Sequence, residues 1–268
     1  MASTDKAEGG IVDTIKQVFY ALLIAGIFRA FFFQPFWIPS GSMKDTLLIG
    51  DFLFVNKMAY GYSQYSCEIP LVNVSFCPFV KGRVLSSEPE VGDVVVFKHP
   101  TSKVDYIKRL IGKPGDKIQM IDGVLHINGT ALKTEPDGFF EEISRAQGPQ
   151  RSPVRCFDNI PVGDGAICQK EKFIETLPNG VEHSILNIVN QPSDNTQVFT
   201  VPAQHYFFMG DNRDNSTDSR FSQLGGGVGY AHEDLLIGRA DRVMFSSAGK
   251  SLFYFWTWRG DRFFKKIE

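Results

Sequence analysis

A single long apolar run near the N-terminus constrains the fold of this chain most. Val18 to Phe33 is apolar except for Arg29. Extended over residues 14–38 it provides about 25 residues, enough to cross a bilayer core of about 30 Å. Arg29 lies near one end, where its guanidinium can extend to the headgroups. We therefore predict a transmembrane anchor over 14–38, preceded by an N-terminal tail over 1–13.

Two other interpretations of this run stay open. Ser40-Gly41-Ser42 is a small-x-small triplet like those that end cleavable signal peptides, although the apolar region exceeds the usual length of about 7–15 residues. A buried core helix is disfavoured, because the run lacks the polar face of an amphipathic helix. Pro35 and Pro39 are expected to end the helix, since proline donates no backbone hydrogen bond. We favour the anchor.

The rest of the chain is patterned mainly as strands, and little of it has helical periodicity. Asp122-Gly123 can supply the positive φ angles of a tight hairpin turn. We therefore predict a mainly β fold, a barrel or a sandwich. The predicted strands cover residues 51–57, 93–98, 106–111, 117–128 as a hairpin, 198–201, 205–209 and 239–245.

The strand pattern divides the chain beyond the anchor into three parts. Residues 39–130 and 198–249 form a β-rich domain, and the polar stretch 131–197 between them forms an inserted lobe. Residues 250–268 are an aromatic and basic C-terminal segment. That composition suits a membrane interface, and a final core strand with a solvated tail is an equal alternative.

Composition and cysteine spacing exclude several classes of protein. A net charge of −2 gives no reason to expect nucleic acid as a partner, and 43% hydrophobic residues exclude a wholly disordered chain. Cys67, Cys77, Cys156 and Cys168 have no metal-binding spacing, so we predict no metal site. In an oxidising compartment Cys67–Cys77 and Cys156–Cys168 are the simplest pairs; four free thiols remain the alternative.

A serine and a lysine carry the chemistry that the sequence indicates. Ser42 follows the apolar run, although a serine before Asp45 also suits a helix N-cap. Lys108 lies in a predicted strand, with Tyr106 and Leu110 on its own face. An exposed strand lysine is the ordinary alternative. A buried lysine loses its proton more easily, and can then act as a base toward a serine hydroxyl.

A third polar segment follows the predicted strand 205–209. The run 210–220, GDNRDNSTDSR, alternates acids, amides and arginines. A surface loop is the default interpretation. The alternation favours a fixed, ion-paired scaffold, because the planar fork of arginine matches a carboxylate at two points.

Ordered sequence blocks connect these features to a known family. The blocks are PSGSM at 39–43, LLIGDFLFVNK at 47–57, GDVVVFKHP at 92–100, DYIKRLIGKPGD at 105–116 and GDNRDNSTDSR at 210–220. Together with Ile237-Gly238-Arg239-Ala240 they resemble the bacterial type I signal peptidases. The likeness covers most of residues 30–130 and 198–245, and no motif covers 131–197.

The resemblance implies a β-rich catalytic domain of signal peptidase type with one N-terminal transmembrane helix. It implies a single-pass protein of the cytoplasmic (inner) membrane, with the catalytic domain on the periplasmic or outer side. Membrane lipid and exported precursor proteins are the implied partners, no cofactor is implied, and the implied activity is removal of signal peptides after small residues. Alternatives are a Ser–Lys peptidase dedicated to one pilin or conjugation substrate, and a non-catalytic membrane-tethered β module.

The resemblance also implies roles for individual residues. Ser42 matches the family's nucleophile and Lys108 its general base, while Ser40 matches an oxyanion-hole donor beside the Ser42 backbone N–H. Asp45 departs from the family pattern, which usually has proline there, and this departure is expected to loosen the turn. The remaining implied residues are Ser216, which positions the lysine, Asp218 and Arg220, which brace the site, and Phe36, Ile38, Leu47, Tyr106 and Ile107, which line the substrate pocket.

Overall fold

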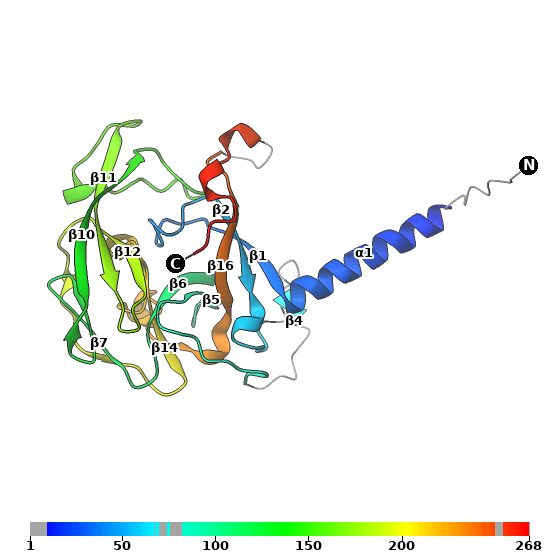
Figure 1. The fold of residues 1–268 in the computed structure, drawn as a ribbon, viewed down its shortest axis with the longest axis horizontal. Helices are drawn as coiled ribbons and strands as arrows, with labels where there is room; N and C mark the ends of the chain where they lie inside the picture. The colour runs from blue at the N-terminus through cyan, green and yellow to red at the C-terminus, as the bar shows by residue number, and fades with distance from the viewer. Residues whose placement is uncertain (1–9, 67, 70–73, 76–81, 250–253, 268) are drawn as a thin grey trace, which may run out of the picture.

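The computed structural model describes residues 10–66, 68–69, 74–75, 82–249 and 254–267. One long helix, α1 (Ile11–Phe31), projects away from a β-rich body (Figure 1). Its stretch Ile11–Arg29 has a mean hydropathy of 1.7, and none of it is buried against the rest of the protein. The mainly β fold with one N-terminal apolar helix, predicted from the sequence, is confirmed.

The helix ends earlier than the sequence analysis predicts. The predicted span 14–38 is wrong at both ends, because α1 begins at Ile11 and stops at Phe31. Phe33–Trp37 form strand β1, which pairs antiparallel with β2 (Asp51–Asn56). Pro35 explains the change, since the residue before a proline is disfavoured in a helix and proline is tolerated in an edge strand.

A seven-stranded sheet forms the centre of the body, in the order β1-β2-β16-β5-β6-β14-β15. Strand β1 is at one edge of this sheet, and the chain passes from α1 directly into it (Figure 1). The sheet joins strands from both halves of the sequence. Its further strands are β5 (Val94–Lys98), β6 (Asp105–Gly112), β14 (His205–Met209), β15 (Ala231–His232) and β16 (Leu236–Ser246).

Smaller sheets complete the body. In the hairpin between β7 and β8, Asp122 and Gly123 have φ angles of 48° and 77°, which confirms the positive-φ turn predicted from the sequence. The strands are β7 (Lys117–Ile121), β8 (Val124–Ile127), β9 (Thr130–Ala131) and β13 (Phe199–Thr200) in one sheet, β10 (Lys133–Ile143), β11 (Ile167–Thr176) and β12 (Glu182–Asn187) in another, and β3 (Glu68–Ile69) with β4 (Val74–Ser75).

Short 3₁₀ helices connect the strands. One of them, η4, lies in the polar run that follows β14. They are η1 (Lys57–Ala59), η2 (Phe157–Asn159), η3 (Pro192–Asp194), η4 (Arg213–Asn215), η5 (Gln223–Gly225), η6 (Glu233–Leu235), η7 (Phe255–Thr257) and η8 (Gly260–Arg262).

Within the proposed lobe 131–197, β10 and β11 form a long ribbon with β12. Most of β10 is exposed, which is why its strand pattern is weak in the sequence. Cys156 and Cys168 form a disulfide with an S–S distance of 2.05 Å, the simplest pairing expected for an oxidising compartment. Cys67 and Cys77 lie outside the described residues.

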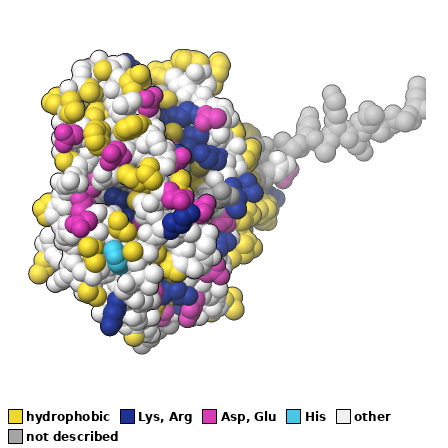
Figure 2. Space-filling model, turned by 60° about the vertical axis from the view of Figure 1, so that its left-hand side comes forward, with side chains coloured by type: hydrophobic (Ala, Val, Ile, Leu, Met, Phe, Trp, Pro, Cys, Tyr) yellow, Lys and Arg dark blue, Asp and Glu magenta, His cyan; other side chains and the backbone are white. Residues whose placement is uncertain are grey.

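Acidic and basic side chains intermingle on the face of the body that Figure 2 turns toward the viewer. Apolar side chains are scattered among them. This face therefore has no extended basic surface of the kind that nucleic acid requires.

The C-terminal segment contains no strand among residues 254–267, so a final core strand is not found there. Isolated main-chain bridges at Trp258 and Lys266 hold the segment. It is also fastened by Arg262, which is 3% exposed. Its Nε donates to Asp51 Oδ1 at 2.9 Å and its Nη2 to Asp51 Oδ2 at 2.5 Å and to Thr46 O at 2.9 Å. The pair thus ties the end of the chain to the start of β2.

We predict that Arg262→Ala lowers the free energy of unfolding by about 3–5 kcal/mol, because it leaves the Asp51 carboxylate buried and unpaired. Arg242→Ala is the control: Arg242 also bonds the C-terminal segment, through Phe264 O at 3.0 Å, but it is exposed. Its loss should cost less than about 1 kcal/mol. Denaturant titrations measure both variants. Equal losses would contradict the claim that the buried Arg262–Asp51 pair stabilises the protein more than the exposed Arg242 contact does.

Candidate active site

Ser42 and Lys108 meet inside the protein although they are 66 positions apart in the sequence. Ser42 lies in the turn that follows β1, and Lys108 lies in β6. Lys108 Nζ is 2.5 Å from Ser42 Oγ. The side chains are nearly closed to solvent, with Ser42 8% and Lys108 4% exposed. The exposed-lysine alternative is therefore wrong, and Ser42 caps no helix because residues 42–46 form turns.

The surroundings of Lys108 favour its neutral form. Burial lowers the pKa of its amine, the carboxylates of Asp218 and Asp211 raise it, and Arg220 lowers it, so that the net pKa is about 8. Nζ also donates to Ile107 O at 3.0 Å. An uncharged amine next to a serine hydroxyl can act as a general base near neutral pH.

The serine turn is fixed from the polar run after β14. Asn212 donates its backbone N–H to Ser42 O at 3.1 Å and its Nδ2 to Gly41 O at 2.9 Å. The turn also closes on itself, because Leu47 N donates to Met43 O at 2.7 Å. The carboxylate of Asp45 forms an ion pair with Lys172, at 3.3 Å.

Gly210 lies where the serine turn and Ser216 come closest. A Cβ added to Gly210 would lie 2.2 Å from Ser216 Oγ and 2.5 Å from Ser42 O, distances at which atoms clash. Its backbone N–H donates to Asp218 Oδ2 at 3.0 Å. Only glycine leaves room for this approach.

Buried ion pairs hold the polar run in place, as its alternating composition predicts. Asp218 accepts from Arg220 Nε at 2.9 Å and Nη2 at 3.0 Å. Burial alone would raise the pKa of Asp218, but Arg220 and the hydrogen bonds it receives hold that pKa below its usual value. Arg213 in η4 pairs in the same manner with Glu175 of β11.

A further buried pair, Arg109–Asp211, is missed by the sequence analysis. Arg109 Nε and Nη2 each donate to a different oxygen of Asp211 at 2.8 Å, and Nη1 donates to Gly92 O at 2.7 Å. Asp211 also accepts from Thr46 Oγ1 at 2.6 Å. Arg109 adjoins Lys108, and Asp211 adjoins Asn212, so this pair joins the two segments that frame the site. The run of acids and arginines at 210–220 is the only signal that pointed to it.

Two more of the predicted residues, Ser216 and Ser40, differ in their exposure to solvent. Ser216 Oγ is buried and has no hydrogen-bond partner among the described residues, so it does not bond Lys108. It lies close enough to Asp218 to help lower the pKa of that carboxylate. Ser40 is exposed, directly before Gly41.

The predicted pocket residues largely come together. Ile38 and Leu47 belong to a buried apolar cluster between the serine turn and the sheet, and Phe36 and Ile107 pack against it. Tyr106 packs against a different cluster, and its ring centroid is 5.5 Å from Lys108 Nζ. Among the described residues, no group of three His, Cys, Asp or Glu side chains is placed to hold a metal ion.

Comparison with known proteins agrees with this geometry. The family model described as signal peptidase, peptidase S26, matches residues 11–245. The chain belongs to this family. It is a serine peptidase, a hydrolase of peptide bonds.

Individual relatives are similar over most of this family member. Signal peptidase I of Rickettsia typhi (strain ATCC VR-144 / Wilmington) is 39% identical over 246 residues, which covers 87% of this chain and 81% of the relative. Signal peptidase I of Rickettsia akari (strain Hartford) is 38% identical over 257 residues, covering 91% and 85%. A crystal structure of a signal peptidase I from Enterococcus faecalis V583 matches with a TM-score of 0.31 and 24% identity, over 57% of this chain and 97% of that one.

We predict that Gly210→Ala lowers kcat roughly 100-fold, because the added methyl group displaces the Ser42 backbone, and a small misplacement has an effect of this size. Gly163→Ala is the control, since a Cβ there has nothing within 4 Å. Kinetics with a peptide substrate measure both. Near-normal turnover by Gly210→Ala would show that the turn tolerates the displacement.

Proposed function

We propose that this family member is a membrane-bound serine endopeptidase that removes signal peptides from exported precursor proteins by a Ser–Lys dyad. The observation that carries the proposal is the 2.5 Å contact between Lys108 Nζ and Ser42 Oγ in a buried site. Family membership supplies the reaction class. The buried contact between a hydroxyl and an amine supports a nucleophile and a base that need no histidine.

The proposed reaction begins with neutral Lys108. Its amine takes the Ser42 proton as the hydroxyl oxygen attacks the carbonyl carbon of the scissile peptide bond. The leaving amine departs with a proton from the lysine, and an ester of Ser42 remains. Water then attacks the ester carbonyl as Lys108 accepts its proton, and Lys108 passes this proton to the departing Ser42 oxygen. The carboxylic acid product leaves, and the Ser42 hydroxyl and the neutral amine are restored.

Two donors are proposed to stabilise the oxyanion. They are the backbone N–H of Ser42 and the hydroxyl of Ser40, which flank Gly41. The exposure of Ser40 supports this role, because its hydroxyl remains available to a substrate. Each such donor typically contributes about 3–4 kcal/mol to stabilisation of the transition state.

The substrate pocket is proposed to accept small side chains at the first and third positions before the cut. Phe36 and Ile107 support this preference, because they are only partly buried and pack against the apolar cluster that contains Ile38 and Leu47. Tyr106 is proposed to border the pocket on the lysine side. Shallow apolar pockets fit an A-x-A-like sequence.

The membrane arrangement is also a proposal. Helix α1 is proposed as a single-pass anchor in the cytoplasmic membrane, with the catalytic domain (39–130 and 198–249) and its inserted lobe (131–197) on the outer side. The apolar, unburied stretch Ile11–Arg29 supports the anchor. In the C-terminal segment Phe255 and Trp256 are 70% and 68% exposed, which supports contact with the lipid interface.

We predict that Ser42→Ala and Lys108→Ala each abolish cleavage of several unrelated precursors while the protein stays folded. The first change removes the nucleophile and the second the base. Mass spectrometry maps the cut, and circular dichroism checks the fold. Substantial cleavage by either variant would refute the dyad, and cleavage of only one pilin-like precursor by the unaltered protein would favour the dedicated peptidase.

The pKa of Lys108 predicts the acid side of the rate profile. Below a pH of about 8 the amine is increasingly protonated and cannot accept the serine proton. The value of kcat/KM should therefore fall about tenfold for each pH unit below that pKa and level off above it. Initial rates between about pH 5 and pH 10, with folding checked at each pH, measure this. A flat profile would exclude a lysine base.

A further inference from the structure

We propose that Lys44 is a positioning residue for the serine turn and that the inserted lobe, through Glu142, holds it in place. The proposal rests on the proposed function of Ser42. It gives residues 131–197, which contain none of the short sequence blocks described above, a part in catalysis: they complete the support of the active-site backbone.

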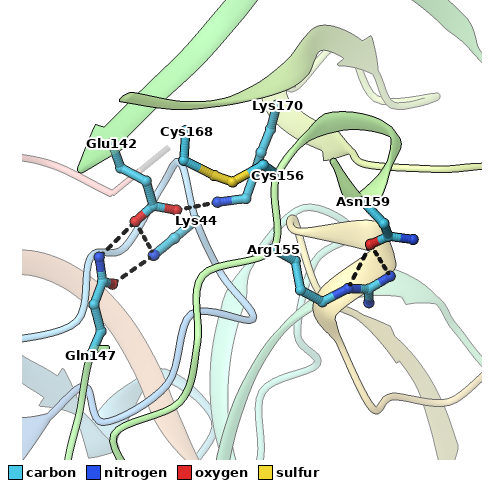
Figure 3. The surroundings of a disulfide bond; sticks show 8 residues. All are labelled: Lys44, Glu142, Gln147, Arg155, Cys156, Asn159, Cys168 and Lys170. Atoms are coloured by element: carbon cyan, nitrogen blue, oxygen red, sulfur yellow. Dashed lines mark hydrogen bonds and ion pairs between the residues drawn. A yellow bond between two sulfur atoms is a disulfide. The ribbon is translucent and has the colours of Figure 1, made fainter. Parts of the chain in front are cut away.

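Lys44 is attached to the lobe by its ammonium group. The side chain is only 5% exposed although it lies two residues after Ser42. Its Nζ donates to Glu142 Oε2 at 2.5 Å and to Gln147 Oε1 at 2.8 Å, and Gln147 Nε2 donates to the same carboxylate at 2.8 Å (Figure 3). Glu142 is in β10, and Gln147 is in the hairpin that follows it.

The stem of Lys44 packs on Gly41. A Cβ added to Gly41 would lie 3.1 Å from Lys44 Cε and 3.4 Å from Cδ. Asn212 holds the carbonyl of the same glycine by a hydrogen bond. Gly41 is therefore fixed by the lysine stem and by Asn212, and it lies between the two proposed oxyanion donors, Ser40 and Ser42.

The lobe reaches the serine turn at a second point. A Cβ on Gly148 would lie 2.6 Å from Pro39 O, so the backbone of this hairpin packs directly on the residue before Ser40. Contacts at Pro39 and at Lys44 thus bracket Ser40, Gly41 and Ser42. The turn cannot shift toward the lobe without displacing the hairpin.

Glu142 is itself held in place. Lys170 of β11 also donates to its carboxylate, and Cys168 lies opposite Glu142 in the strand register (Figure 3). Cys168 is tied to Cys156 by the disulfide. Burial alone would raise the pKa of Glu142, but Lys44 and Lys170 lower it, so the carboxylate stays ionised between two ammonium groups. Moving Lys44 away would leave its buried charge without this partner, which is costly.

The two lysines provide a matched comparison, because one carboxylate serves both. Lys44→Met and Lys170→Met each leave one buried lysine paired with Glu142, so neither variant strands a charge. Lys170 is as buried as Lys44, at 2% exposed, but it belongs to β11 and not to the serine turn. Both variants should therefore lose similar stability, and only Lys44→Met should disturb the turn.

The test is steady-state kinetics on a precursor peptide, with rates expressed per folded molecule and thermal unfolding measured in parallel. Lys44→Met should lower kcat roughly 10- to 100-fold with KM within about twofold, because the donors act on the transition state. The low-pH side of its pH–rate profile should have the same midpoint as that of the unaltered enzyme, since Lys108 is unchanged. Lys170→Met should keep kcat within about twofold, because Lys44 and Gln147 still hold the Glu142 carboxylate without it.

Gln147→Leu repeats the test without touching a charge, should Lys44→Met not fold. It removes the second acceptor of Lys44 and should lower kcat severalfold with KM unchanged. Equal losses of kcat in Lys44→Met and Lys170→Met, or normal kcat in Lys44→Met or in Gln147→Leu, would overturn the positioning role. Ser42→Ala in the same assay reports separately on the dyad: if it still cleaves, the proposed function fails, whatever Lys44 does.

Discussion

The burial of the Lys108 amine is the constraint on which the rest of this site depends. An ammonium group in that position would lose most of its hydration, and the nearby Asp218 and Asp211 carboxylates only partly compensate, so the neutral form becomes accessible near pH 8. Only the neutral amine can accept the proton of Ser42 Oγ, so the contact between the two atoms depends on this shift for its role in catalysis. A solvated lysine at the same distance would keep its proton and activate nothing.

The architecture serves to keep that amine dry and the serine beside it. The seven-stranded sheet places β5, β6 and β14 side by side, which brings the polar run after β14 to the serine turn. Arg109–Asp211 and Arg220–Asp218 then neutralise the carboxylates that lie closest to the lysine. With both carboxylates engaged by arginines, their pull on the Lys108 proton is weakened, which is consistent with the net lowering of its pKa.

Local patterns in the sequence predict a large part of this structure. The buried strand β5 is a short apolar run close to Gly92, and the Asp122-Gly123 turn is specified by its own two residues. The family motifs point to Ser42 and Lys108 before any fold is known. The end of α1 shows a limit of prediction from sequence. The apolar run predicts a helix as far as Ile38, but the helix ends at Phe31. The aromatic residues around Pro35 suit the edge strand β1 as well as they suit a membrane helix.

What the sequence does not reveal are contacts between distant side chains. Lys44 and Glu142 are 98 positions apart, and Arg109 and Asp211 are 102 apart, so no periodicity connects them. Strand β10 is mostly exposed and therefore lacks the alternation that marks a half-buried strand. These contacts depend on the completed fold, and they are the ones that tie the lobe and the polar run to the serine turn.

The most direct test of the central claim is an NMR titration of the Lys108 amine in the full-length protein in detergent, using isotope-labelled lysine and Lys108→Ala to assign the resonance. The account predicts a pKa of about 8, well below the usual value of 10.5. A titration midpoint near 10.5 would leave almost no neutral amine at neutral pH, and the proposed base could then not accept the serine proton at a useful rate.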